Sequence, residues 1–201
     1  MKKLQPERWR SVAFFGDSIV EGVTSDYRRT KDTWCKIVAD EYGFRHQNFG
    51  RGGSCFTPGC NGKVPSISET IKEADITGYD AIFIGGGIND WMFDAPLGEF
   101  KRSLDETLHL IKSRFDGDII FITPIYPSII KRIKKSGFVK YEGIVARRAY
   151  DARISVIRGI YFKWDTILNT SSKKILWDGI HPTELGYRIY AENVEKQIDA
   201  I

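Results

Sequence analysis

Short apolar runs alternate along the chain with longer amphipathic stretches. Five of the runs predict strands, at residues 11–15, 44–49, 81–84, 119–122 and 159–164. Four stretches have apolar positions at helical spacing, at residues 33–42, 97–115, 144–157 and 183–201. Strands that are apolar throughout and alternate with helices are typical of a parallel sheet covered on both faces. The pattern therefore predicts an α/β protein, a three-layer α/β/α sandwich with a five-stranded parallel sheet.

No linker, repeat or shift in composition divides the sequence, and we expect a single domain over residues 1–201. No apolar run approaches the ~18 residues of a membrane span. The first eight residues are partly basic, but no apolar stretch follows them, so they do not have the pattern of a secretory signal. If Met1 is the natural start, this predicts a cytoplasmic protein. A chain whose leader had been removed would have the same pattern.

The charge of the chain is mild overall and uneven along its length. Lysine and arginine number 30 and acidic residues 26, which gives a net charge of +4. With no binding motif present, this charge does not predict a nucleic-acid partner. The basic residues concentrate in residues 131–158. This segment is interpreted as a solvated surface, a contact for an anionic substrate or surface, a mobile lid, or a contact between copies in a homo-oligomer.

The three cysteines, Cys35, Cys55 and Cys60, match no zinc-binding spacing. We expect free thiols in a cytoplasmic protein, and a Cys55–Cys60 disulfide is the alternative in an oxidising compartment. No metal site is predicted from these residues.

Four motifs fall where a parallel sheet places its ligands, beyond the carboxyl ends of strands or just before the last helix. They are Gly16-Asp17-Ser18-Ile19-Val20-Glu21-Gly22, Asn48-Phe49-Gly50-Arg51-Gly52-Gly53-Ser54, Gly85-Gly86-Gly87-Ile88-Asn89-Asp90 and Trp177-Asp178-Gly179-Ile180-His181-Pro182. Each has an ordinary explanation, such as a helix cap, a surface loop or the start of a helix. Neither glycine-rich nucleotide-binding pattern is present.

Taken together, the motifs supply the parts that serine hydrolysis needs. Ser18 offers a hydroxyl nucleophile, and Asp178 stands three residues before His181, where a carboxylate can orient an imidazole base. Glycine N–H groups and the Asn89 amide offer donors for an oxyanion. The G-x-S-x-G elbow of α/β-hydrolases is absent at Ser18, so another family of serine hydrolases is indicated.

At these positions the sequence resembles the SGNH hydrolases, also called GDSL-type esterases and lipases. Their first block is similar to Gly16-Asp17-Ser18-Ile19, their third to Gly87-Ile88-Asn89-Asp90, and their fifth to Asp178 through His181. The glycine of their second block is placed at Gly53, with Gly50 and Gly52 as rivals. Order and spacing agree over about residues 11–200.

The resemblance implies a flavodoxin-like SGNH hydrolase fold and a role for each matched residue. It makes Ser18 the nucleophile, His181 the general base and then acid, and Asp178 the residue that orients His181. It forms the oxyanion hole from the Ser18 N–H, the Gly53 N–H and the Asn89 side-chain amide. It also implies catalysis without a metal or an organic cofactor.

The family cleaves acyl esters and thioesters that range from acetylated sugars to lipids. Tyr27, Trp91 and Trp177 lie beside the motifs and are candidate substrate-binding residues, with packing in the core as the alternative. We expect hydrolysis of short acyl esters, acetyl above all, on a carbohydrate-like alcohol. The alternatives are a thioesterase, a lysophospholipase-type lipid esterase or an acyltransferase using the same site, and a carbohydrate-binding domain without catalysis.

Overall fold

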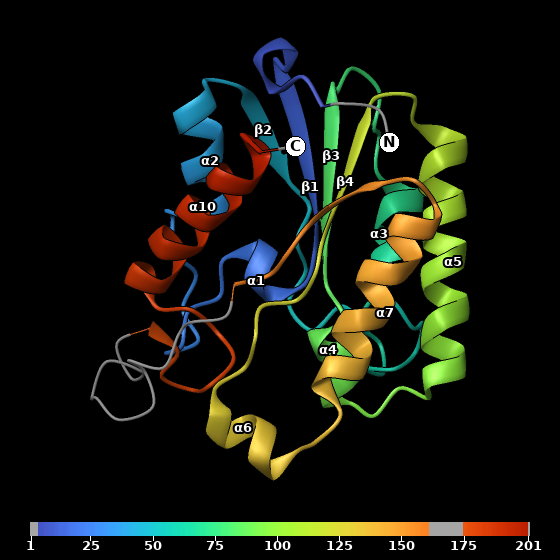
Figure 1. Cartoon of the computed structure of the whole chain (residues 1–201), viewed down its shortest axis with the longest axis vertical. Helices are drawn as coiled ribbons and strands as arrows, with labels where there is room; N and C mark the ends of the chain where they lie inside the picture. Colours follow the sequence, from blue (N-terminus) through green and yellow to red (C-terminus); the bar gives the residue numbers. More distant parts are fainter. Residues whose placement is uncertain (1–3, 161–174, 201) are drawn as a thin grey trace.

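A five-stranded, fully parallel sheet forms the centre of the computed structural model, which describes residues 4–160 and 175–200. The strand order is β2-β1-β3-β4-β5, and Figure 1 labels the first four of these strands. The strands are β1 (Ser11–Gly16), β2 (Arg45–Asn48), β3 (Ala81–Gly85), β4 (Asp118–Ile122) and β5 (Ser155–Ile157). The predicted α/β sandwich with a five-stranded parallel sheet is therefore confirmed.

The helices cover both faces of the sheet, with α2 and α10 on one side and α3, α5 and α7 on the other (Figure 1). Their bounds are α2 (Trp34–Tyr42), α3 (Ile67–Glu73), α5 (Leu97–Arg114), α7 (Phe138–Asp151) and α10 (Glu184–Ile198). Three short helices, α1 (Ser18–Glu21), α4 (Ile88–Met92) and α6 (Ile129–Lys134), lie at the carboxyl end of the sheet, and a 3₁₀ turn, η1 (Pro6–Arg8), precedes β1. In the part of the chain that the structure describes, no helix combines the length and apolar character needed to cross a membrane.

Aromatic side chains fill the layers between the sheet and its helices. Every residue of β1 is buried, as expected for a strand with helices on both faces. Phe14 of β1 stacks on Phe83 of β3 at 5.1 Å between ring centroids and meets Trp34 of α2 edge-on at 5.2 Å. On the opposite layer, Phe56 stacks on Phe121 of β4 at 6.1 Å. These contacts hold the central strands rigidly, and the loops at their carboxyl ends are anchored to that frame.

The fifth strand lies earlier in the sequence than we predicted. β5 is formed by Ser155–Ile157, which pairs with β4, whereas the expected strand was 159–164, of which 161–164 lie outside the described residues. The helix predicted at 144–157 runs instead from Phe138 to Asp151. Arg153 adopts a φ of 60°, which ends the helical path and turns the next residues into the sheet. Just beyond β5, Gly159 packs against the loop that leaves β4, where a Cβ would lie 2.3 Å from the Pro124 carbonyl oxygen.

Two central strands approach each other closely at their carboxyl ends. Gly16 of β1 is in register with Gly85 of β3, and a Cβ on Gly16 would lie 2.2 Å from the Gly85 carbonyl oxygen. Only glycine fits such an approach. The first and third sequence motifs therefore lie side by side at the carboxyl ends of these two strands.

Candidate active site

Ser18 is the first residue of α1, directly beyond the end of β1. Asp17 caps this helix: its Oδ1 accepts a hydrogen bond from the Ile19 N–H at 2.9 Å. Gly22 ends the helix after a single turn with a φ of 97°. The capping explanation of Asp17 is therefore confirmed, and the cap fixes Ser18 at the rim of the sheet. Burial raises the pKa of Asp17 to about 6, because its carboxyl is removed from water.

Asp178 and His181 come from a tight turn just before α10. Asp178 Oδ1 accepts hydrogen bonds from the Ile180 N–H at 2.9 Å and from the His181 N–H at 2.8 Å. Gly179, with a φ of 84°, allows the chain to fold back within this turn. The same carboxylate therefore shapes the turn and reaches the imidazole.

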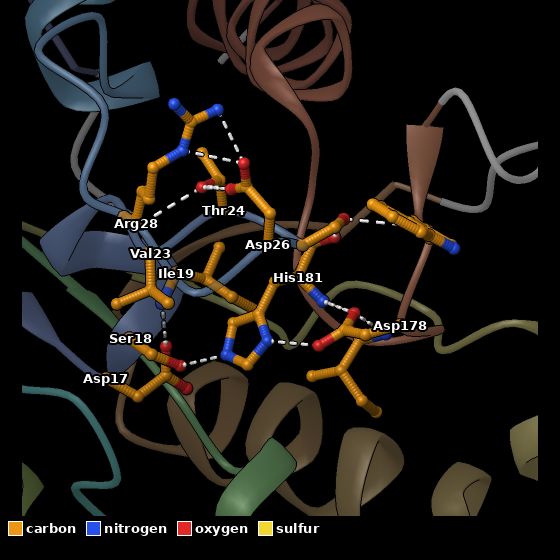
Figure 2. Close-up of polar contacts among 12 residues, drawn as sticks. Asp17, Ser18, Ile19, Val23, Thr24, Asp26, Arg28, Asp178 and His181 are labelled. Atoms are coloured by element: carbon orange, nitrogen blue, oxygen red, sulfur yellow. Dashed lines mark hydrogen bonds and ion pairs between the residues drawn. The ribbon is translucent and has the colours of Figure 1, made fainter.

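A continuous chain of hydrogen bonds joins the three side chains (Figure 2). The His181 Nδ1–H donates to Asp178 Oδ2 at 2.6 Å, which leaves Nε2 as the acceptor nitrogen of the neutral ring. Ser18 Oγ lies 2.9 Å from that Nε2. Burial favours the protonated form of Asp178, but hydrogen bonds from the His181 ring and from two backbone N–H groups outweigh it and lower the pKa of this carboxyl. The arrangement can take a proton from Ser18 and stabilise the resulting imidazolium.

The glycine-rich loop after β2 passes directly beside α1. The Gly50 N–H donates to Asn48 Oδ1 at 2.8 Å, and the Gly52 N–H donates to Glu21 Oε2 at 2.7 Å. Among the described residues, the Gly53 N–H has no acceptor, so of the three rivals it is the one free to bind a ligand. Glu21 had no predicted role. Its Oε1 also forms a salt bridge with Arg29 Nη2 at 2.6 Å. No pattern in the sequence distinguishes it from any exposed helix glutamate.

Asn89 and Asp90 of α4 hold the same loop from the other side. Asn89 Nδ2 donates to the Ser54 carbonyl oxygen at 2.9 Å and retains a second N–H. Asp90 is fully buried, and its two carboxylate oxygens accept the Phe56 and Thr57 N–H groups at 2.9 Å each. Burial raises the pKa of Asp90, although these hydrogen bonds oppose the shift. One hydrogen bond thus joins the third motif to the second, and two more join it to the residues that follow the second motif.

The three candidate substrate-binding aromatics have different surroundings. Tyr27 is 72% exposed, and its ring lies 5.7 Å from the His181 ring, between centroids. Trp177 is 63% exposed and lines a cavity of about 500 Å³ beside the site. Trp91 is only 1% exposed: its Nε1–H donates to the Ser136 carbonyl oxygen at 2.9 Å. Trp91 therefore has the packing role that was its alternative, while Tyr27 and Trp177 are accessible.

One group of possible metal ligands occurs in the described ranges, 4–160 and 175–200. The sulfur atoms of Cys55 and Cys60 and a carboxylate oxygen of Asp90 lie within 4.8 Å of one another. Both oxygens of Asp90 are already engaged by backbone N–H groups. Burial also raises the pKa of both thiols, which favours the protonated form over the thiolate that binds metals. The three residues therefore have the character of an interior polar cluster, and all three cysteines of the chain are free thiols.

The chain is similar to known proteins in its family pattern and in its fold. The model of the GDSL-like lipase/acylhydrolase family matches residues 14–189. No curated protein matches the sequence. Among solved structures, a protein from Lactobacillus plantarum is similar with a TM-score of 0.76 at 19% identity, covering 96% of this chain and 97% of its own.

Two further solved structures carry the names of enzymes. A lipase/acylhydrolase from Enterococcus faecalis has a TM-score of 0.69 at 19% identity, with 95% of this chain and 96% of that chain covered. An acetylxylan esterase from Geobacillus stearothermophilus has a TM-score of 0.71 at 19% identity, with 94% of each chain covered. At these identities the likeness shows the fold, and the class of protein is set by the family match: a hydrolase of the esterase and lipase type. The chain belongs to the GDSL-like lipase/acylhydrolase family.

Proposed function

We propose that the protein is a serine esterase that removes short acyl groups, acetyl above all, from a carbohydrate-like alcohol. The observation that carries this proposal is the chain of hydrogen bonds from Ser18 Oγ through His181 to Asp178, with distances of 2.9 and 2.6 Å. A carboxylate, an imidazole and a hydroxyl in this order are the arrangement that activates serine as a nucleophile.

Each residue has a defined part in the proposed reaction. His181 Nε2 takes the proton of Ser18 while Oγ attacks the ester carbonyl carbon, and Asp178 stabilises the imidazolium. The negative charge that develops on the carbonyl oxygen is met by donors in the oxyanion hole, the N–H groups of Ser18 and Gly53 and the remaining N–H of Asn89. His181 then gives its proton to the leaving alcohol oxygen. The ester bond breaks and the acyl group remains on Ser18.

Water completes the cycle by the same steps. His181 takes a proton from a water molecule, whose oxygen attacks the acyl-enzyme carbonyl carbon. The tetrahedral intermediate collapses, the bond to Ser18 Oγ breaks, and the proton on His181 returns to that oxygen. The carboxylic acid leaves, and Ser18 is again a hydroxyl in contact with His181.

The choice of a carbohydrate-like alcohol rests on the exposed aromatic rings beside the site. Tyr27 and Trp177 offer flat apolar faces of the kind on which sugar rings stack, and Tyr27 stands next to the base. Tyr27 has a φ of 60°, an uncommon conformation for a bulky residue, which its turn holds through a 2.8 Å bond from the Tyr27 N–H to the Thr24 carbonyl oxygen. The similar fold of an acetylxylan esterase supports the same choice.

Two measurements test the proposal. We expect wild-type protein to hydrolyse p-nitrophenyl acetate and Ser18→Ala to lose this activity by about 10³-fold or more, because no nucleophile remains. Equal rates for the two proteins would overturn the catalytic assignment. On a panel of p-nitrophenyl esters from acetyl to long acyl chains, together with acetylated xylo-oligosaccharides, we expect the acetyl compounds to give the highest kcat/KM. A kcat/KM that rises with chain length would instead identify a lipid esterase.

A further inference from the structure

The turn that carries Asp178 and His181 has to be held at the correct distance from Ser18, and its own hydrogen bonds cannot do this. The bonds from the Ile180 and His181 N–H groups to Asp178 Oδ1 lie within the turn and fix only its shape. Ser18 lies 163 positions away from His181 in the sequence, on α1. The turn is bonded to the loop before α6, where the Ser128 N–H donates to the Gly179 carbonyl oxygen at 2.8 Å, but only its contacts with the segment that follows α1 join it directly to the half of the site that carries Ser18.

Ser25 provides three of these contacts, and the ring of Tyr27 meets the His181 ring in the same region. The Ser25 hydroxyl donates a short hydrogen bond to the His181 carbonyl oxygen and accepts one from the Trp177 N–H at 3.1 Å. The Ser25 N–H donates to the Pro182 carbonyl oxygen at 3.2 Å. These three bonds reach the turn on both sides of Asp178. Because Ser25 is only 5% exposed, water does not readily replace its hydroxyl.

Ser25 is in turn connected firmly to Ser18. The Ser18 carbonyl oxygen accepts hydrogen bonds from the Gly22 N–H at 3.0 Å and the Val23 N–H at 2.8 Å. One residue, Thr24, separates Val23 from Ser25, and the Thr24 N–H is fixed by a 2.8 Å bond to the Arg28 carbonyl oxygen. A short, hydrogen-bonded path thus runs from the backbone of Ser18 to the backbone of His181 (Figure 2 shows its surroundings).

We propose that Ser25 is a positioning residue for catalysis: its hydroxyl sets the distance and direction between His181 Nε2 and Ser18 Oγ. This inference rests on the proposed serine esterase function. The Ser18–His181 hydrogen bond is 2.9 Å long, and a misplacement of about 1 Å in such a contact can reduce turnover about 10²-fold. The probe p-nitrophenyl acetate has no sugar ring to stack on Trp177, and its binding does not depend on this distance, so with this probe the loss falls on kcat rather than on KM.

The test uses Ser25→Ala, which removes the hydroxyl and leaves the backbone bond to Pro182. Active sites are counted with a fluorophosphonate that labels the nucleophilic serine, so that misfolded protein does not lower the apparent rate. Per labelled site, we expect kcat for p-nitrophenyl acetate to fall roughly 10- to 100-fold, with KM within about twofold of the wild-type value. Ser25→Thr, which keeps a hydroxyl at the same position, is expected to recover most of the loss.

Tyr187→Phe is the matched control, because the Tyr187 hydroxyl holds the same segment without touching the turn. It donates to the Val23 carbonyl oxygen at 2.8 Å. We expect this variant to keep kcat within about twofold of wild type, even if its melting temperature falls. An equal loss of kcat in Tyr187→Phe and Ser25→Ala would mean that general loosening of the segment is responsible, and would overturn the proposal.

The remaining outcomes are also decisive. A Ser25→Ala variant with wild-type kcat per labelled site would overturn the positioning role. If Ser25→Ala does not fold, Ser25→Cys carries the same test: its weaker donor is expected to lower kcat several-fold at unchanged KM, and unchanged kcat would overturn the role. Failure of the underlying function is recognised separately, because then Ser18→Ala itself retains activity.

Discussion

Asp17 has a buried carboxyl next to the nucleophile, and its titration makes a sharp prediction about stability. Its Oδ1 caps α1, yet burial raises its pKa from the ordinary value of 3.8 to about 6. Asparagine is as good a helix cap as aspartate and has nearly the same size, but it does not ionise. The substitution Asp17→Asn therefore removes the buried charge while it keeps the hydrogen bond to the Ile19 N–H.

The sign and size of the effect follow from proton linkage. Between pH 4 and pH 6 the folded wild-type protein retains a proton that the unfolded chain has released, so wild-type stability falls as the pH rises through this window. A shift of about two units corresponds to about 3 kcal/mol. Asp17→Asn has no such dependence. The stability of Asp17→Asn relative to wild type should therefore rise by roughly 2–3 kcal/mol between pH 4 and pH 8.

Urea denaturation of both proteins at several pH values from 4 to 8 measures this difference. The amide that Asp17→Asn introduces adds a fixed cost if it lacks an acceptor, but that cost is the same at every pH and cancels from the slope. All other titrating groups are shared by the two proteins, and of these His181 and Asp90 interact electrostatically with Asp17. A difference in unfolding free energy that stays constant across the range would refute the reasoning, because the folded pKa of Asp17 would then not be raised.

Two further substitutions probe the site at other points. Asp178→Asn presents an amide N–H to His181 Nδ1 and favours the wrong tautomer of the imidazole. In steady-state kinetics, kcat should fall about 10⁴-fold with little change in KM. A loss of kcat below tenfold would contradict the proposed role of Asp178. Gly50→Ala places a Cβ 2.3 Å from the Glu21 backbone nitrogen, so it should lower stability by about 1–3 kcal/mol and reduce kcat by displacing α1. An unchanged urea midpoint for Gly50→Ala would contradict this prediction, because the loop would then accommodate the Cβ without a loss of stability.

The three central strands could be predicted from the sequence because burial on both faces determines their composition. β1, β3 and β4 lie inside the sheet between two layers of helices, and they are marked by unbroken apolar runs. β5 could not be placed in this way because two apolar runs, before and after Gly159, compete for one position beside β4. The conformation of Arg153 and the close packing of Gly159 fix where the first run enters and leaves the sheet, and both are tertiary effects. No helix was predicted at α3, although the capping box of Ser66 and Glu69 was a usable signal.

For the site, residue type and order were sufficient to bring Ser18, Asp178 and His181 together as candidates. Gly53 was placed in the oxyanion hole only through the family resemblance, because the glycines of the loop after β2 all have the same side chain. The choice depends on which N–H is already bonded, and the acceptors, Asn48 and Glu21, come from different elements. Trp91 and Trp177 likewise both adjoin motifs. Only burial, 1% exposed against 63%, separates them.

The separation of Ser18 and His181 by 163 positions has a consequence for how activity arises during folding. A growing or truncated chain that ends before residue 178 contains the serine, the glycine loop and Asn89, but no base to activate the nucleophile. Contacts between such distant segments form late because the loop they close is long. Under the proposed mechanism, hydrolysis therefore begins only when the chain before α10 has docked against α1. The catalytic rate would therefore report completed folding, whereas the appearance of secondary structure can report a chain in which α10 has not yet docked.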